Sequence, residues 1–362
     1  MGSSLRMSKL VLGVGVTIWE PRARPDGDYA TIMEKRVIKP PTVRRSRNKA
    51  IRNLLSRKLD LSDTFNKEAA AALVLIGFQH VSRVGEMRGH SALLRTLVER
   101  WRPQTHTFHL LVGEVTVTLE DVSYTLSFPI NGEAVTSRSD SSHQFLVENC
   151  IVCFGRELGP QDHVLGKVNI AWVRRCRDTE LCDTQSLLSG YIWGVASLAH
   201  LYRSLCRASR YNCKKMDDPL TLLFVWSWER MPLLAPIPCD QLGDVGIPLA
   251  RRWSHWHRYT RYIRRLTAYF RRGLDDMRVD DFIWRPYMGV GIPDVLAPQM
   301  VMCSTQSPLM SFKCIEWHPT DPVRRQFGMQ QLPPGPAFNL GCDHCKRLTG
   351  AQNHEWGHIY SQ

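Results

Sequence analysis

Residues 219–232 read PLTLLFVWSWERMP, and this stretch decides the fold class. It is apolar over most of its length and bounded by prolines, which predicts a buried helix over 220–230 that Pro232 ends. Residues 189–209 have the same apolar character and predict a second, mostly buried helix. Residues 253–277 predict one long helix with a stripe of large apolar side chains on one face. The stripe consists of Trp256, Tyr259, Ile263, Leu266 and Phe270.

Earlier in the chain, a helix and a small hairpin are expected in succession. Apolar residues recur at helical spacing between Leu93 and Trp101, and Pro103 stops the pattern. Alternating apolar residues then stand on both sides of Gly113, at 108–110 and at 115–119. This alternation is typical of two short strands joined by a turn.

Polar residues at helix-start spacing predict two further helices. Thr118 with Asp121 three residues later begins one of them. Asp321 is expected to cap the other, with Pro322 in its first position and Gly328 after its end. The sequence therefore predicts a mainly α protein, a single large helical domain over 61–362 with a small β-hairpin element.

The positive charge of the chain is concentrated at its start. The 362 residues carry a formal net charge of +13, with 43% hydrophobic and 22% charged residues, a composition that excludes wholesale disorder, collagen and coiled coil. Residues 1–60 contain 14 Lys and Arg against 5 Asp and Glu, or +9 of that charge, and we interpret them as a flexible basic N-terminal arm.

A dense basic run within this arm is typical of a nuclear-import signal or a nucleic-acid contact, and a solvated tail without a receptor is the equal alternative. Its residues are Lys35, Arg36, Lys39, Arg44, Arg45, Arg47 and Lys49.

Membrane insertion and secretion are not expected. No segment reaches the roughly 18 apolar residues that cross a bilayer. The apolar stretch Leu10–Trp19 resembles the core of a signal peptide but has no small-residue cleavage site after it. The 11 cysteines are an odd number scattered through apolar segments, which favours a reducing compartment, cytosol or nucleus.

No familiar catalytic motif is present, so neither an enzyme nor a cofactor is expected. The sequence lacks a phosphate-binding P-loop, a nucleophile elbow and a zinc-protease helix. The spacing C-x2-C-x8-H-x3-H of Cys342, Cys345, His354 and His358 supplies zinc ligands, but it is shorter than in a zinc finger. We therefore favour a chance composition over a metal site there. Cys150 and Cys153 are interpreted as buried helix cysteines.

Two groups of charged residues each allow a functional and a structural interpretation. The acidic residues Asp275, Asp276, Asp280 and Asp281 could serve a metal-dependent hydrolase, but a solvated helix end explains them more simply. Arginines interleaved with aromatics over 251–272 could bind phosphates and bases, or they could be the solvated face of an amphipathic helix, which we favour. The arginines of this possible surface are Arg258, Arg261, Arg265 and Arg272.

Several motifs in order resemble the plant mobile domain, the domain of MAINTENANCE OF MERISTEMS and MAIN-like proteins and of plant transposable elements. They include ERWRPQTHTFH at 99–109, TLEDV at 118–122, WSWER at 226–230 and DFIWRPY at 281–287. The resemblance is best over about 70–330, and we expect the C-terminal end to be shorter than in the family. Motif residues that we interpret as structural are Glu99, Arg100, Trp101, Thr107, Phe108, Trp226, Trp228, Glu229, Arg230, Trp284 and Tyr287.

The resemblance implies a nuclear, non-enzymatic protein derived from a transposon. It implies a role in meristem maintenance, transposon silencing and genome stability, with nuclear proteins or chromatin as partners and nucleic acid contacted through the basic arm. The family's "aminotransferase-like" label, and the phosphatase names of some members, find no matching chemistry in these residues. The alternatives are a metal-dependent hydrolase, a nuclease relic of a transposase, or a degenerate transposon-encoded copy.

Overall fold

The computed structural model describes the helical body of the chain and a few short pieces outside it. The described ranges are 89–135, 142–154, 156–164, 192–210, 219–238, 248–254, 260–312 and 314–336, with short strands and single residues elsewhere. The basic arm 1–60 lies outside them apart from the backbone of two short strands. The division of the chain at residue 60 therefore stays a prediction.

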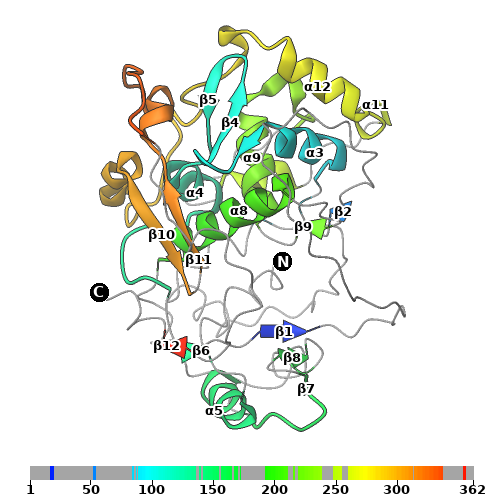
Figure 1. Cartoon of the computed structure of the whole chain (residues 1–362), viewed down its shortest axis with the longest axis vertical. Coiled ribbons are helices and arrows are strands. Elements are labelled where there is room, and N and C mark those ends of the chain that lie inside the picture. Colours follow the sequence, from blue (N-terminus) through cyan, green and yellow to red (C-terminus); the bar gives the residue numbers. More distant parts are fainter. Residues whose placement is uncertain are drawn as a thin grey trace, which may run out of the picture.

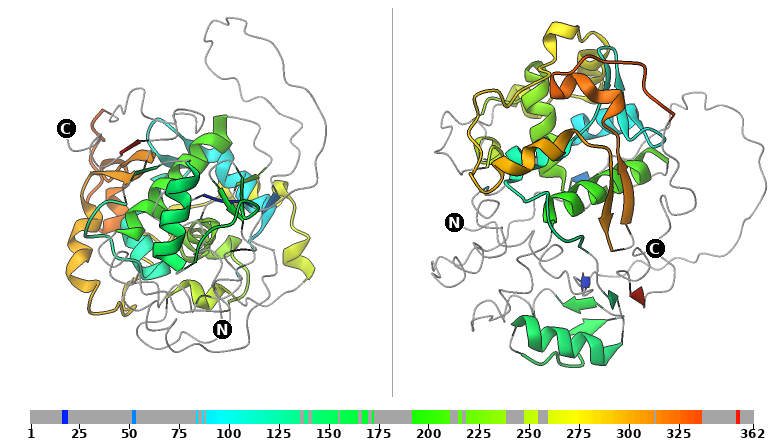
Figure 2. Two further views of the ribbon diagram at one scale, coloured as in Figure 1. Left: turned by 90° about the horizontal axis from the view of Figure 1, so that it is seen from below. Right: turned by 90° about the vertical axis from the view of Figure 1, so that its left-hand side faces the viewer.

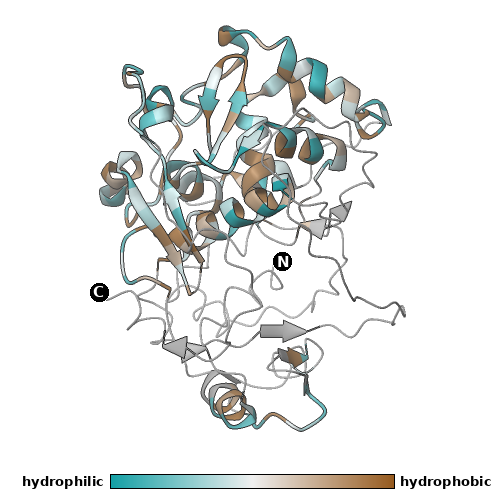
Figure 3. Cartoon of the chain, in the orientation of Figure 1, coloured by the Kyte–Doolittle hydropathy of each residue, from teal (hydrophilic) through white to brown (hydrophobic). Residues whose placement is uncertain are grey.

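Two buried helices form the centre of the molecule (Figures 1 and 2). Helix α9 (Leu220–Arg230) is buried at every residue, which confirms the helix expected there. Helix α8 (Trp193–Arg210) is also mostly buried. Hydrophobic residues are concentrated around these two helices in Figure 3. The protein is mainly α, as the sequence predicts, and none of the described helices is long and apolar enough to span a membrane.

Helix α3 (Ser91–Arg100) and a three-stranded antiparallel sheet cover one side of this centre. The sheet consists of β3 (Trp101–Arg102), β4 (Thr107–Leu110) and β5 (Gly113–Val115). Gly113 has a φ of 124°, a conformation that favours glycine at the turn between β4 and β5. The predicted hairpin is thus confirmed, but its second strand is Gly113–Val115, earlier than the expected 115–119, because α4 begins at Leu119.

Helix α4 (Leu119–Leu126) begins as predicted. The Thr118 backbone N–H donates to Asp121 Oδ2 at 2.7 Å, and Thr118 Oγ1 accepts from the Asp121 N–H, which completes a capping box. Ser127 ends the helix in the left-handed region, with a φ of 53°. Val122 and Leu126 lie on its buried face.

The sequence did not predict a second hairpin that covers α8. Strands β10 (Ser307–Ser311) and β11 (Cys314–His318) pair antiparallel and contact α8. Their buried positions include Ser311, Glu316 and His318. Because polar residues take the inward positions, the hydrophobic alternation that normally marks a strand is absent.

The single long helix predicted over 253–277 is wrong. The chain forms α10 (Ala250–Ser254), α11 (Thr260–Ile263) and α12 (Thr267–Asp275). Leu266 has extended backbone and is 74% exposed, so it does not belong to a buried stripe. The turn at Leu266 lets Tyr262 and Phe270 both pack against His90, with ring centroids at 5.2 and 4.8 Å. This aromatic packing replaces the continuous helix.

The last predicted helix is present with a different cap. It is the 3₁₀ helix η6 (Asp321–Phe327), whose N-cap is Thr320 and whose C-cap is Gly328 with a φ of 74°. Asp321 therefore lies in the first turn and does not cap the helix, and its carboxylate pairs with Arg324 at 3.6 Å. The predicted end at Gly328 is confirmed.

Shorter elements complete the fold. Helix α5 (His143–Phe154), with β7 (His163–Val164) and β8 (Lys167–Asn169), lies at the opposite end of the molecule from β4 and β5 (Figure 1). The remaining elements are β1 (Thr17–Trp19), β2 (Arg52–Asn53), β6 (Arg138–Ser139), β9 (Lys215–Met216), β12 (His354–Glu355), η3 (Pro232–Leu234), η4 (Val279–Asp281) and η5 (Ala297–Ser304).

Candidate functional site: two buried polar clusters

Motif residues in α3 and β4 connect helices and strands through ion pairs and hydrogen bonds. The Glu99 carboxylate accepts two hydrogen bonds from Arg271, at 2.7 and 2.5 Å, and Arg100 pairs with Asp275. These exposed ion pairs join α3 to α12. On β4, Thr107 Oγ1 donates to Glu114 Oε2 at 2.7 Å.

The tryptophans of the motifs lie in the core. Trp226 stacks on Phe108 with ring centroids 5.0 Å apart, which packs α9 against β4. Trp228 packs on Trp253, whose indole N–H donates to Glu229 Oε1. Burial raises the pKa of Glu229, while this hydrogen bond opposes the shift. The arrangement supports the interpretation of these residues as structural.

The first buried polar cluster, which we call the aspartate cluster, consists of Asp121, Arg230, Tyr287 and Thr118. Asp121 Oδ1 accepts from Arg230 Nη2 at 2.8 Å and from the Tyr287 hydroxyl at 2.6 Å. Asp121 Oδ2 accepts from the backbone N–H and the hydroxyl of Thr118 at 2.7 and 2.8 Å. The carboxylate that caps α4 therefore also binds α9 and the segment at Tyr287.

Electrostatics in the aspartate cluster follow from its burial. Burial lowers the pKa of Arg230, but the attraction of Asp121, Tyr287 and Glu120 and the hydrogen bond to Asp121 together outweigh this effect, so the pKa is raised and the guanidinium stays charged. Burial and the neighbouring Asp121 charge raise the pKa of Tyr287, which keeps its hydroxyl protonated as a donor. Burial, together with the Asp121 charge, raises the pKa of Glu120 to about 7.

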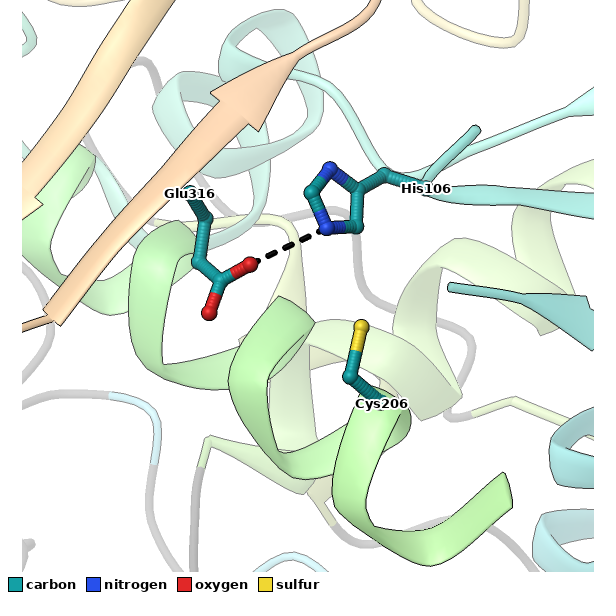
Figure 4. A group of neighbouring side chains, drawn as sticks. All are labelled: His106, Cys206 and Glu316. Carbon is teal, nitrogen blue, oxygen red and sulfur yellow. Dashed lines mark ion pairs between the residues drawn. The ribbon is translucent and has the colours of Figure 1, made fainter. Parts of the chain in front are cut away.

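The second buried polar cluster, which we call the histidine cluster, consists of His106, Cys206, Glu316 and Arg203 (Figure 4 shows the first three). His106 Nε2 lies 3.0 Å from Glu316 Oε2, and Arg203 Nε lies 3.5 Å from Glu316 Oε1. Cys206 Sγ accepts from the indole N–H of Trp101 at 3.3 Å. The cluster joins the turn before β4 to α8 and β11.

A neutral histidine lies next to this region. His318 Nδ1 is 3.1 Å from the carbonyl oxygen of Thr305, and burial lowers the pKa of His318 to about 4. Gln326 nearby bonds both backbone groups of Thr116, at 2.7 and 2.8 Å. Polar residues of β11 and of η6 are thus also held in internal hydrogen bonds.

The predicted acidic group does not converge. Asp275 pairs with Arg100, and Asp281 Oδ2 accepts from the Arg278 N–H at 2.9 Å. Asp276 and Asp280 are exposed, on the turns that follow α12. Within the part of the chain that the structure describes, the histidine cluster is the only group of three His, Cys, Asp or Glu placed to hold a metal ion.

Several predicted site residues lie outside the described residues. These are the basic run Lys35, Arg36, Lys39, Arg44, Arg45, Arg47 and Lys49, and also Arg258, Cys342, Cys345 and His358. Only the backbone of His354 is described, in β12, so the Cys/His spacing stays a prediction. Cys150 is buried in α5, as expected, whereas the side chain of Cys153 lies outside the described part.

Neither buried cluster was predicted as a unit. Thr118 and Asp121 were recognised only as a helix cap, and Arg230 and Tyr287 only as parts of separate motifs. The partners are 109 and 166 residues apart from Asp121 in the sequence, a separation at which no spacing rule operates. The available signal was the presence of charged residues inside otherwise apolar motifs, such as Glu229 and Arg230 after a run of buried side chains.

The family model of the plant mobile domain matches residues 77–192 and 186–360. The chain belongs to the plant mobile domain family. This plant mobile domain is 32% identical over 349 residues to the Serine/threonine-protein phosphatase 7 long form homolog of Arabidopsis thaliana, covering 80% of this chain and 25% of that relative. Its similarity to MAIN-type proteins confirms the resemblance seen in the motifs.

The relatives with MAIN names include two further Arabidopsis thaliana proteins. Protein MAIN-LIKE 1 is 29% identical over 71% of this plant mobile domain and 58% of the relative. Protein MAINTENANCE OF MERISTEMS is 26% identical over 74% and 63%. The chain thus spans from a quarter to under two thirds of these relatives' lengths. No solved structure matches it significantly.

Proposed function

We propose that this plant mobile domain is a non-enzymatic nuclear interaction module of the MAIN-like class. It would act on chromatin, directly or through nuclear proteins, in meristem maintenance, transposon silencing and genome stability. The names of two relatives, MAIN-LIKE 1 and MAINTENANCE OF MERISTEMS, support the class and the connection to meristems.

One observation carries the non-enzymatic part of the proposal. Two charged pairs of the family motifs, Asp121–Arg230 and Glu316–His106, are buried, and the members of each pair are directed at one another. All four side chains are at most 4% exposed. A catalytic acid or base has to reach its substrate within hydrogen-bond distance, and groups in this position reach only their partners.

The exposed arginines of α11 and α12 supply a surface for an acidic partner. Arg261, Arg264 and Arg272 are exposed and form no ion pair with any described carboxylate. Arg271 differs because Glu99 holds it. Exposed guanidinium groups without an ion pair suit phosphates or acidic side chains, which they can bind in a bidentate manner.

Arg265 belongs to the fold more than to this surface. Its guanidinium carbon lies 4.9 Å from the ring centroid of Tyr262 and 4.2 Å from that of Tyr269. The cation is therefore stacked on the rings that pack α11 against α12. A charge reversal designed to remove binding without loss of stability should leave Arg265 in place.

The basic arm supports the nuclear part of the proposal through its composition. Seven Lys and Arg fall between residues 35 and 49, a density typical of import signals. The same run would also contact nucleic acid.

The enzyme alternatives have little support among the described residues. The acidic group at 275–281 does not converge on a metal position, and one of its members is neutralised by Arg100. A phosphatase name belongs to one relative, of which this chain covers 25%. Metal-dependent turnover that Asp280→Asn abolishes would contradict the proposal.

The direct test is recovery of the tagged full chain from plant nuclei, with bound proteins and bound DNA identified together. We expect nuclear proteins or chromatin fragments above the free-tag control. A nuclease-treated sample separates partners held through DNA from partners held directly. Recovery of the chain from nuclei with neither proteins nor DNA above the control would overturn the proposal.

A further inference from the structure

The two ring nitrogens of His106 both face oxygen atoms. Nδ1 lies 3.0 Å from the backbone carbonyl of Trp317, which can only accept, so Nδ1 carries a proton. In neutral imidazole the other nitrogen, Nε2, then presents a lone pair. It lies 3.0 Å from Glu316 Oε2, which is also an acceptor when the carboxyl is ionised. A cation or an extra proton has to lie between these two atoms.

A third donor atom converges on the same point. The ligand atoms of His106, Cys206 and Glu316 lie within 4.8 Å of one another, and all three residues are buried (Figure 4). One imidazole nitrogen, one thiolate sulfur and one carboxylate oxygen are all ligand types that zinc accepts. The three residues come from the turn before β4, from α8 and from β11, so nothing in the local sequence forces them together.

Each of the three side chains is also held from outside. The Trp317 carbonyl accepts from His106 Nδ1, and the Trp101 indole N–H donates to Cys206 Sγ, whereas Arg203 contacts Glu316 Oε1 through an ion pair at 3.5 Å without a hydrogen bond. Metal ligands in proteins characteristically have such outer hydrogen bonds, which orient the ligand and set the histidine tautomer. The backbone of His106 has a φ of 53°, a strained conformation for a non-glycine residue.

We propose that the histidine cluster binds one transition-metal ion, Zn²⁺ by its ligand set, through His106 Nε2, Cys206 Sγ and Glu316. Because the three ligands are buried, the ion would tie the turn before β4, α8 and β11 together and would perform no catalysis. A structural ion of this kind contributes to folding directly. The proposal is independent of the proposed nuclear function.

Arg203 does not oppose this assignment. With zinc, a thiolate, a carboxylate and Arg203, the cluster has a net charge of +1. With an imidazolium, a carboxylate, a neutral thiol and Arg203, it also has a net charge of +1. The two arrangements therefore face the same burial cost for net charge, and the convergence of the sulfur on the His106–Glu316 pair favours the metal.

The test measures metal in the purified full chain by mass spectrometry, without added chelator. We expect about one zinc per chain, bound tightly enough to survive gel filtration. Cys206→Ser should lose this zinc. The matched control is Cys314→Ser, which changes an equally buried cysteine whose thiol donates to the Ala199 carbonyl and has no place in the cluster. It should keep the zinc.

Two further samples keep the result decisive. The double variant Cys342→Ser/Cys345→Ser should also keep the zinc, since its loss there would assign the metal to the C-terminal segment. If Cys206→Ser does not fold, protein produced with Co²⁺ decides: a near-ultraviolet sulfur-to-cobalt band of one thiolate supports the histidine cluster, and a band of two thiolates contradicts it. Metal-free protein with a melting temperature unaffected by chelator would overturn the proposal and leave an ion pair between His106 and Glu316.

Discussion

Asp121 accepts a 2.8 Å hydrogen bond from Arg230 while both side chains are completely buried. The two residues come from α4 and α9, and Tyr287 joins them through the same carboxylate oxygen. The contact therefore connects two family motifs and a helix cap in one ion pair. Burying such a pair costs desolvation energy. Removing only one partner destabilises the folded protein strongly, because the other charge stays buried without a counter-charge.

Asp121→Asn should lower the free energy of unfolding by about 3–5 kcal/mol, because Arg230 would remain buried with its charge unpaired. Urea unfolding followed by tryptophan fluorescence measures this loss. Tyr287→Phe removes one hydroxyl donor and should cost about 1–2 kcal/mol, which keeps the test usable if the first variant does not fold.

The matched control is Glu99→Gln, which breaks the ion pair with Arg271 on the surface. Since solvent screens exposed pairs, the expected loss is below about 1 kcal/mol. Equal losses for Asp121→Asn and Glu99→Gln would contradict the structural role of the aspartate cluster.

His318 should make the protein less stable in acid. The pKa of His318 is about 4 in the folded chain, below the ordinary histidine value of 6.5. Its contribution to stability is therefore complete above pH 6.5 and is lost as the pH falls from there through 4, with a slope of up to about 1.4 kcal/mol per pH unit. Urea unfolding from pH 7 to 4 measures this slope.

In this pH series, His318→Asn keeps a donor for the Thr305 carbonyl and removes the titration. Its stability should fall less steeply with acid than that of the wild type. His109→Asn is the control, because His109 is exposed on β4. If the free energy of unfolding of His318→Asn fell with acid as steeply as that of the wild type, protonation of His318 would not destabilise the folded chain, and the prediction would be wrong.

Glu120 acts in the opposite direction. Its pKa is raised from 4.5 to about 7, so the folded chain binds a proton that the unfolded chain has released. The resulting stabilisation is complete below pH 4.5 and is lost as the pH rises through 7. Glu120→Gln should therefore be more stable than the wild type at pH 8, by about 1–3 kcal/mol after allowance for its partial exposure. The exposed Glu157→Gln serves as control, and wild-type stability equal to that of Glu120→Gln at pH 8 would refute the shift.

The sequence predicts the apolar helices well and the polar interior poorly. Helix α9 was expected over 220–230 and is found over Leu220–Arg230, because a largely apolar run bounded by prolines predicts a buried helix between them. Strands β10 and β11 were missed, because Glu316 and His318 occupy inward positions that a hydrophobic pattern would leave to apolar residues. The long helix over 253–277 was wrong, because the packing of His90 between Tyr262 and Phe270 depends on a residue far away in the sequence.

The candidate sites divide in the same way. Trp226 and Trp228 were interpreted as structural because they are apolar residues of a family motif, and both are buried. The histidine cluster had no signal in spacing, since Cys206 lies 100 residues after His106 and Glu316 lies 110 residues after Cys206. Only the folded chain brings these residues together.

The basic arm should direct the protein to the nucleus. Replacing Arg44, Arg45, Arg47 and Lys49 with alanine removes most of the run, so a fluorescent fusion of the full chain should shift from the nucleus to the cytoplasm. Confocal imaging in plant cells measures the ratio of the two signals. Substitution of Arg22 and Arg24, which lie outside the run, is the control. A nuclear signal unchanged by the four substitutions would assign import to another segment.

The measurement that tests the central claim most directly is recovery of partners from plant nuclei with Arg261→Glu/Arg272→Glu, compared with the wild type. These two exposed arginines lie outside every buried cluster, so the variant should fold with an unchanged melting temperature. The control Arg102→Glu/Arg210→Glu makes the same charge change at exposed positions on β3 and α8. The account predicts that the first variant loses the proteins or DNA that the wild type and the control retain. Equal recovery by all three would contradict it.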